Sequence, residues 1–308
     1  MRFSTSATLA LATLAVARPQ IVKKQVPRNI DPAILQYALT LEHLENAFYK
    51  RALSLWDQKS FVDAGFSPAF HDQLKYIAHD EEGHVVYLAA GLKAAGAMPV
   101  EACQYTFPMT DPKSFVKMAS VIEGLGVSAY LGAAADITSK AYLTAAGSIL
   151  VTETLHQSAT RGASGEIPMA NVFGTPLGLN AVYTIASQFI SECPTTNAAL
   201  PVMAYPELVT VTAGAVATNA IVDLLPSVTL NGTYYTTFVS GLDIIPTTPK
   251  GILDGMIQAI VPSAVQGQSY VFLTKDNSGN LTDSNIIAGP AIIEVTPNSP
   301  TFNLTITR

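Results

Sequence analysis

The chain has 308 residues, of which 49% are hydrophobic and 13% are charged. This composition excludes a disordered chain, because disordered segments are poor in apolar residues and rich in charge. The formal net charge is −6, and no basic run is longer than a pair such as Lys23-Lys24, so we expect no nucleic-acid partner. Two cysteines are too few for a four-cysteine zinc or iron–sulfur site.

The N-terminus has the three parts of a secretory signal peptide, predicted over residues 1–17. Arg2 supplies the positive charge, residues 7–14 form an apolar run, and Ala15-Val16-Ala17 fits the cleavage rule. The apolar run is too short to span a bilayer, and no transmembrane segment is expected. Residues 18–29 are expected to form a linker or a pro-segment. The sequence therefore predicts a secreted protein, extracellular or associated with the cell wall.

Secretion also bears on the cysteines and on glycosylation. An even number of cysteines in an oxidising compartment favours one disulfide, Cys103–Cys193, and the alternative is two buried free thiols. N-glycosylation motifs occur at Asn231, Asn280 and Asn303, all in the C-terminal part of the chain.

Residues 30–200 lack the alternation of strands and predict a helical bundle. Asp31-Pro32 opens the first helix, with Asp31 as the expected N-cap and Pro32 at the first helical position. Further helices are predicted at about 67–94, 111–138, 140–159 and 179–191. The third and fourth helices (111–138 and 140–159) are joined by a very short connection, which favours an antiparallel arrangement of the two.

Residues 201–308 differ from the preceding region in residue composition and pattern, and they predict a β-rich domain. Segments rich in β-branched and aromatic residues alternate with turn clusters, at 228–238, 269–274, 291–295 and 302–307. A domain of this size with such strands is typical of a small β-sandwich. The expected fold is therefore mainly α, with a four-helix bundle followed by a β-sandwich-like domain.

Two of the predicted helices each contain a single carboxylate in a long uncharged stretch. Glu123 is the one charged residue among the 18 residues from Met118 to Ala135, and Glu153 is the one among the 20 from Ala141 to Thr160. Such a side chain faces the core, where an unpaired charge costs several kcal/mol. Each of the two carboxylates must therefore be compensated by a partner.

The partners follow from a spacing that occurs twice along the chain. A Glu-x-x-His pair places a carboxylate and an imidazole on one helix face, and a Glu followed seven residues later by a Tyr does the same over two turns. The resulting order is a twofold internal pseudo-repeat: Glu42 to Tyr49, Glu81 to His84, Glu123 to Tyr130 and Glu153 to His156.

This order matches the ligand set of carboxylate-bridged di-iron and di-manganese bundles. Four carboxylates balance two divalent ions, and carboxylate with imidazole suits iron or manganese. We therefore expect two iron or manganese ions, with Tyr49 and Tyr130 as hydrogen-bond donors to the ligands. Glu45 shares a face with Glu42 and either replaces it or adds a further carboxylate. The alternative is four buried carboxylates satisfied by tyrosine, histidine and water.

These motifs carry a family resemblance. The segments 41–49, 79–84 and 153–156, together with Glu123, resemble secreted ferritin-like proteins of ascomycete fungi, which include stress-response and late-sexual-development proteins related to plant desiccation-associated ones. Segments 270–274 and 288–295 resemble the fungal members too. The resemblance implies a ferritin-like bundle but no settled activity, and the ferroxidases, rubrerythrins and manganese catalases of this fold serve as analogies.

Two functions fit these expectations. The first is a secreted di-metal redox protein, in which peroxide or dioxygen binds between the ions and ferrous ion or peroxide is the substrate. The second is a non-catalytic cell-wall or stress-protection protein, in which the ions hold the bundle together. A ferritin-type storage cage is disfavoured, because an appended β-domain would have to fit on every subunit.

Overall fold

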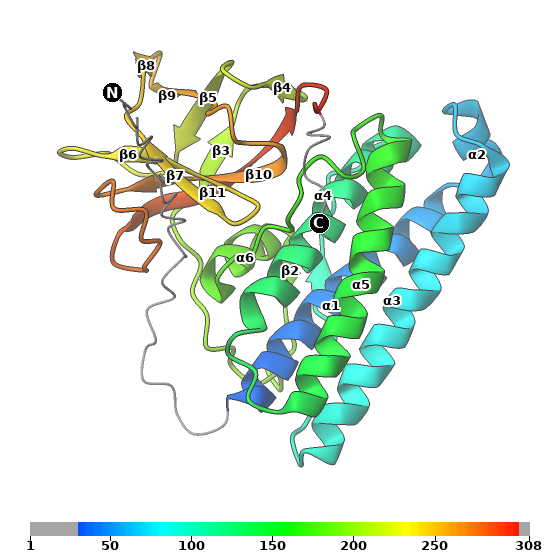
Figure 1. Cartoon of the computed structure of the whole chain (residues 1–308). Helices are drawn as coiled ribbons and strands as arrows, with labels where there is room; N and C mark the ends of the chain where they lie inside the picture. The colour runs from blue at the N-terminus through cyan, green and yellow to red at the C-terminus, as the bar shows by residue number, and fades with distance from the viewer. Residues whose placement is uncertain (1–29, 302–308) are drawn as a thin grey trace, which may run out of the picture.

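The computed structural model describes residues 30–301. A bundle of four long helices lies beside two packed sheets (Figure 1). The predicted signal peptide (1–17), the segment 18–29, the last predicted strand and the Asn303 motif lie outside the described residues. No helix in the described range 30–301 has the length and apolar character needed to cross a membrane.

The bundle consists of α1 (Asp31–Leu55), α3 (Pro68–Ala94), α4 (Pro112–Ala133) and α5 (Lys140–Ala163). Helix α1 packs mainly against α3, and α4 packs mainly against α5. A short helix that the sequence did not predict, α2 (Gln58–Asp63), connects the first pair, and α6 (Leu179–Ala186) follows the bundle. The predicted disulfide Cys103–Cys193 is present. It lies beside the strand pair of β1 (Gln104–Tyr105) and β2 (Ile190–Glu192).

Helix starts show where local signals were sufficient. Asp111 is the N-cap of α4, where its carboxylate accepts the backbone N–H of Ser114 and the Ser114 hydroxyl accepts that of Asp111. The predicted N-cap of the first helix is wrong, because Ile30 occupies that position. The Asp31 carboxylate instead accepts the backbone N–H groups of Thr138 and Ser139. It thereby ties the start of α1 to the turn between α4 and α5, and α4 ends before the predicted Thr138.

Two sheets form the β-sandwich. One has the order β4-β11-β10-β6-β7 and the other the order β3-β5-β9-β8. The predicted strands at 228–238, 269–274 and 291–295 overlap three of them, and the other six were missed because they are short or lack regular alternation. The strands are β3 (Leu208–Thr210), β4 (Val216–Ala217), β5 (Ile221–Pro226), β6 (Tyr235–Ser240), β7 (Asp243–Thr247), β8 (Gly251–Leu253), β9 (Met256–Ile260), β10 (Gly267–Thr274) and β11 (Ile286–Thr296).

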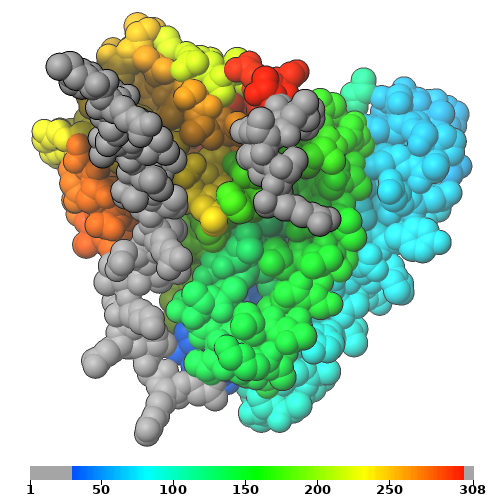
Figure 2. Space-filling view, viewed as in Figure 1, coloured from blue at the N-terminus to red at the C-terminus, as the bar shows by residue number. Residues whose placement is uncertain are grey.

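Strand β10 joins the two parts of the molecule. Successive side chains of a strand point to opposite faces, so Val271 and Leu273 enter the core between the sheets, while Tyr270 and Phe272 pack into the core of the helices. The Tyr270 and Ser128 hydroxyls form a 2.8 Å hydrogen bond, which holds the sheet against α4. Figure 2 shows the α5 surface (green) directly beside that of α3 (cyan), on the helical side of the molecule.

An ion pair strengthens the same junction. The Arg161 guanidinium near the end of α5 donates from both terminal nitrogens to the two carboxylate oxygens of Glu294 on β11, each at 2.7 Å. Such a bidentate contact fixes orientation as well as distance. The sandwich therefore positions α4 and α5, the two helices with the lone carboxylates.

Candidate metal centre

The six predicted ligands meet in the middle of the bundle. Helix α1 supplies one carboxylate and α4 another, while α3 and α5 each supply a Glu-x-x-His pair. All four glutamates are 0% exposed, and the side chains of His84 and His156 are 12% and 5% exposed. The residues that could bind metal here are Glu42, Glu81, His84, Glu123, Glu153 and His156.

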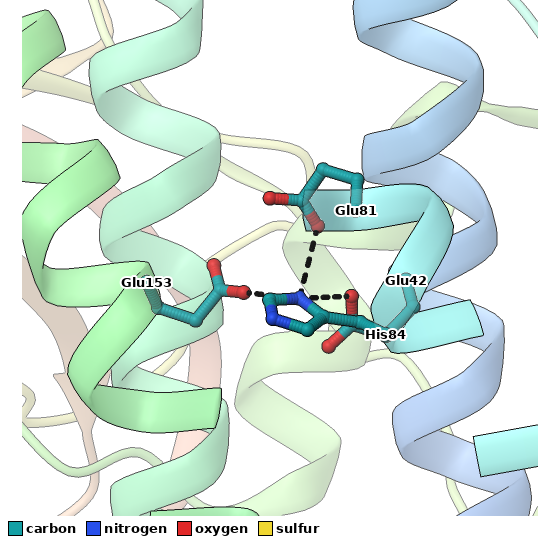
Figure 3. A group of neighbouring side chains, drawn as sticks. All are labelled: Glu42, Glu81, His84 and Glu153. Atoms are coloured by element: carbon teal, nitrogen blue, oxygen red, sulfur yellow. Dashed lines mark hydrogen bonds and ion pairs between the residues drawn. The ribbon is translucent and has the colours of Figure 1, made fainter. Parts of the chain in front are cut away.

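One group of ligand atoms surrounds His84 (Figure 3). Its Nδ1 atom lies 3.2 Å from Glu42 Oε2, 3.2 Å from Glu153 Oε1 and 3.5 Å from Glu81 Oε2. The four ligand atoms of this group all lie within 4.8 Å of one another, so one metal ion could contact all of them.

A second group surrounds His156. Its Nδ1 atom lies 2.9 Å from Glu81 Oε1 and 3.4 Å from Glu123 Oε2. The group contains Glu153 as well, again with ligand atoms within 4.8 Å of one another. Glu81 and Glu153 belong to both groups, so the structure presents two adjacent ligand clusters that share two carboxylates.

Several of these atoms have no partner outside the cluster. The oxygens of Glu81 and Glu153, Glu123 Oε2 and His156 Nδ1 are buried, and among the described residues no group outside the cluster hydrogen-bonds to them. Native proteins pair nearly all buried polar groups, because an unpaired one costs free energy. Carboxylate oxygens and imidazole nitrogens are ligands of first-row transition metals, so the unpaired atoms fit a metal site.

Burial and mutual repulsion shift the protonation of the cluster in the absence of metal. Burial raises the pKa of Glu81 to about 7, although hydrogen bonds to His156 and His84 oppose the shift. Burial and the neighbouring Glu81 charge raise the pKa of Glu153 well above its usual range. Burial alone would lower the imidazole pKa values, but the adjoining carboxylates raise them to about 12 for His84 and about 11 for His156. Without metal, imidazolium ions therefore balance part of the carboxylate charge.

The two tyrosines donate across the bundle rather than along their own helices. The Tyr49 hydroxyl on α1 donates to Glu123 on α4, and the Tyr130 hydroxyl on α4 donates to Glu42 on α1. Burial, together with the nearby carboxylates, raises the pKa of both phenols well above its usual value, so they remain protonated donors. Each tyrosine thus hydrogen-bonds to one carboxylate oxygen of the glutamate on the other helix of the α1–α4 pair.

Glu45 lies beside the cluster but in neither ligand group. It is buried, and burial together with the charge of Glu153 raises its pKa well above the usual range, which favours the neutral acid. The first helix therefore contributes Glu42 to the ligand groups, and Glu45 stands next to them as a further carboxyl group.

Sequence reasoning missed two residues that shape the site. Asp80 Oδ2 lies 3.2 Å from Nε2 of His156, the ring nitrogen that faces away from the ligand cluster. Gly126 leaves room for the carboxyl groups, because a Cβ atom there would lie 2.8 Å from Glu45 Oε1 and 2.9 Å from Glu153 Oε2. Asp80 could have been noticed because it directly precedes the predicted ligand Glu81. Nothing in the local sequence distinguishes Gly126 from other helical glycines.

Comparison with known proteins agrees with this geometry. Residues 30–166, which contain the complete ligand set, match the family model described as "Ferritin-like domain". A curated relative, Protein rds1 of the fission yeast Schizosaccharomyces pombe, is 25% identical over 180 residues. That match covers 58% of this chain and 44% of the relative, so the chain spans less than half of the relative's length. The helical part of this chain therefore matches a ferritin-like domain and contains a buried carboxylate–histidine cluster that could bind metal ions.

Proposed function

We propose that this protein is a secreted di-metal redox protein that binds two iron or manganese ions and oxidises ferrous ion or consumes peroxide. The observation that supports it is the pair of ligand groups around His84 and His156, in which the shared, buried carboxylates of Glu81 and Glu153 have no hydrogen-bond partner outside the cluster among the described residues. The secreted location rests on the predicted signal peptide, and a role in stress response or development rests on the family resemblance.

Each residue has a place in this proposal. Glu42 and His84 would help to hold one ion, Glu123 and His156 the other, and Glu81 and Glu153, which belong to both groups, would contribute to both. Such a pair would supply two-electron chemistry, in which two electrons from ferrous ion and two protons reduce dioxygen to hydrogen peroxide, or hydrogen peroxide to two waters.

The protein contributes positioning and exclusion of water. The four glutamates are fully buried, so their charges act in a region of low dielectric. The Tyr49 and Tyr130 hydroxyls orient Glu123 and Glu42 and hold their protons at neutral pH. Asp80 orients the ring of His156.

The packing of the bundle favours a catalytic over a structural role for the ions. One end contains a dry aromatic cluster in which Phe48, Phe61 and Phe115 are fully buried. Leu39, Leu92 and their neighbours form a second apolar cluster. Because apolar packing extends beyond the ligand cluster, we expect the metal-free protein to remain helical.

The test is metal content and turnover after reconstitution with iron or manganese. We expect close to two ions per chain, and oxidation of ferrous ion or loss of peroxide. Glu123→Ala should abolish the turnover and keep the helical circular dichroism signal. The control is Glu82→Ala, because Glu82 is exposed and pairs with Lys50. Absence of bound metal would refute the site.

The same experiment separates the proposal from its alternative, a non-catalytic cell-wall or stress-protection protein. Cooperative unfolding on chelation, with no turnover for either metal, would favour that alternative. Asn231 and Asn280 are exposed, so both sites are accessible to the predicted glycosylation, which either function allows.

A further inference from the structure

A cavity of about 60 Å³ lies within the bundle, between the metal centre and the turn that joins α4 to α5. All four long helices line it. Its volume exceeds the roughly 10–15 Å³ that one water molecule needs by this measure. Protein interiors are close-packed, so a cavity of this size is a specific feature.

The cavity is apolar, and small side chains create it. Gly91, Ala129, Ala133, Ala145 and Ala146 line its wall, and their short side chains leave the space between the helices unfilled. The carboxylate at its far end, Asp31, is engaged by the turn between α4 and α5. The wall therefore offers few hydrogen-bonding groups to a polar molecule.

The near end of the cavity reaches the metal centre. Tyr130 lines the cavity, and its hydroxyl donates to Glu42. Leu41 precedes Glu42 in α1, and Leu88 lies one helical turn beyond His84 in α3, and both line the cavity too. A molecule in the cavity would lie beside the His84 half of the centre.

The mouth of the cavity lies between α3 and α5. Tyr87, a lining residue on α3, is 56% exposed, and Ala145 on α5 is partly exposed.

We propose that this cavity binds a small, uncharged, apolar molecule and presents it to the Tyr130 side of the metal centre. If the protein has the proposed redox function, it follows that its oxidant is dioxygen rather than hydrogen peroxide; this consequence rests on the proposed function. Hydrogen peroxide would lose its hydrogen bonds to water on entering the apolar cavity, which costs free energy, whereas dioxygen forms no such bonds in water. Apolar cavities of this kind stay dry and take up xenon.

Xenon tests the binding step without any metal. Crystals of the protein pressurised with xenon should show a bound atom in the cavity, and Ala146→Leu should remove it by filling the space. Ala141→Leu is the matched control, because Ala141 is exposed on the same helix and does not line the cavity. Ala133→Leu is a second filling variant if Ala146→Leu fails to fold. Absence of xenon from the wild type, or its retention in a folded filling variant, would overturn the proposal.

Turnover tests the oxidant. In iron-loaded protein, Ala146→Leu should slow ferrous oxidation by dioxygen by roughly tenfold or more, the equivalent of about 1.4 kcal/mol of ligand binding. Oxidation by added hydrogen peroxide should stay within about twofold of wild type, since a difference of that size is below 0.5 kcal/mol. An equal loss with both oxidants would overturn the assignment of dioxygen. If the wild type oxidises ferrous ion with neither, the proposed function fails, and the xenon result still decides whether the cavity binds an apolar guest.

Discussion

The two halves of the candidate metal centre are alike in sequence and different in structure. Each has a Glu-x-x-His pair, yet Nε2 of His156 is 3.2 Å from Asp80, whereas Nε2 of His84 forms no hydrogen bond within the described residues. The position that corresponds to Asp80 in the other repeat is Thr152, whose hydroxyl bonds to the backbone of its own helix. His84 is also the more exposed of the two.

The difference shows that an internal repeat need not create two equivalent positions. A carboxylate behind a metal-binding histidine orients the ring and raises its basicity. The His156 half has this support and lies on the helix that Arg161 anchors to the sandwich. The His84 half lacks it and lies beside the apolar cavity, so we expect the halves to differ in metal affinity.

The largest effect should come from Glu81, because it belongs to both ligand groups. Glu81→Ala should abolish binding of both ions, and the double replacement of Glu81 and His84 should do the same. Glu82→Ala on the same turn should leave metal content unchanged. Elemental analysis after reconstitution measures this, and retention of one ion in Glu81→Ala would show that the halves do not share this ligand.

Gly126→Ala should disrupt the centre from the opposite helix. Its Cβ would lie 2.8 Å from Glu45 and 2.9 Å from Glu153, so the carboxyl groups must move and metal binding should be lost. Gly147→Ala on α5 is the control, because its Cβ would meet nothing within 4 Å. That variant should gain about 0.5–1 kcal/mol in the free energy of unfolding. Normal metal content in Gly126→Ala would contradict the prediction.

Metal affinity should rise with pH. The pKa values of His84 and His156 are about 12 and about 11 in the metal-free protein, so both rings carry a proton at neutral pH that a metal must displace. Each displaced proton makes the affinity rise about tenfold per pH unit, or about a hundredfold for the pair. Calorimetry in buffers of different ionisation enthalpy counts the protons released.

Stability of the metal-free fold should have the opposite dependence. Because the folded pKa values of both histidines are raised, their ion pairs contribute fully below the ordinary histidine pKa and are lost as pH rises through about 11 to 12. Metal affinity that is independent of pH between 6 and 8 would contradict the assigned protonation.

The smallest effect should come from Asp80 and sharpen the comparison directly. Asp80→Asn should weaken one ion by roughly 10–100-fold and leave the other unchanged, because the carboxylate supports His156 alone. Thr152→Val is the matched variant in the other repeat and should change neither. Stepwise metal titration separates the two ions, and an equal loss at both would mean that Asp80 acts on the whole bundle.

The sequence by itself determined much of this protein, because its strongest signals are local. Two helices begin within one residue of the predicted starts at 67 and 111, because their N-caps, Ser67 and Asp111, bond only to the next few residues. Helical spacing was enough to group the four glutamates with His84 and His156, since residues three or four apart share a face. The disulfide followed from the number of cysteines and the predicted compartment.

Only the tertiary structure decided between residues that share a helix face and showed which groups from different helices meet. Glu42 and Glu45 share one face of α1, and only the packing of four helices places Glu42 among the ligands. Tyr49 and Tyr130 each donate to the opposite helix, and Asp31 reaches the next helical turn instead of capping its own, because side chains bond to whatever packing brings near. Gly126 matters through the carboxyl groups that face it, which are distant in sequence and meet only in the folded bundle.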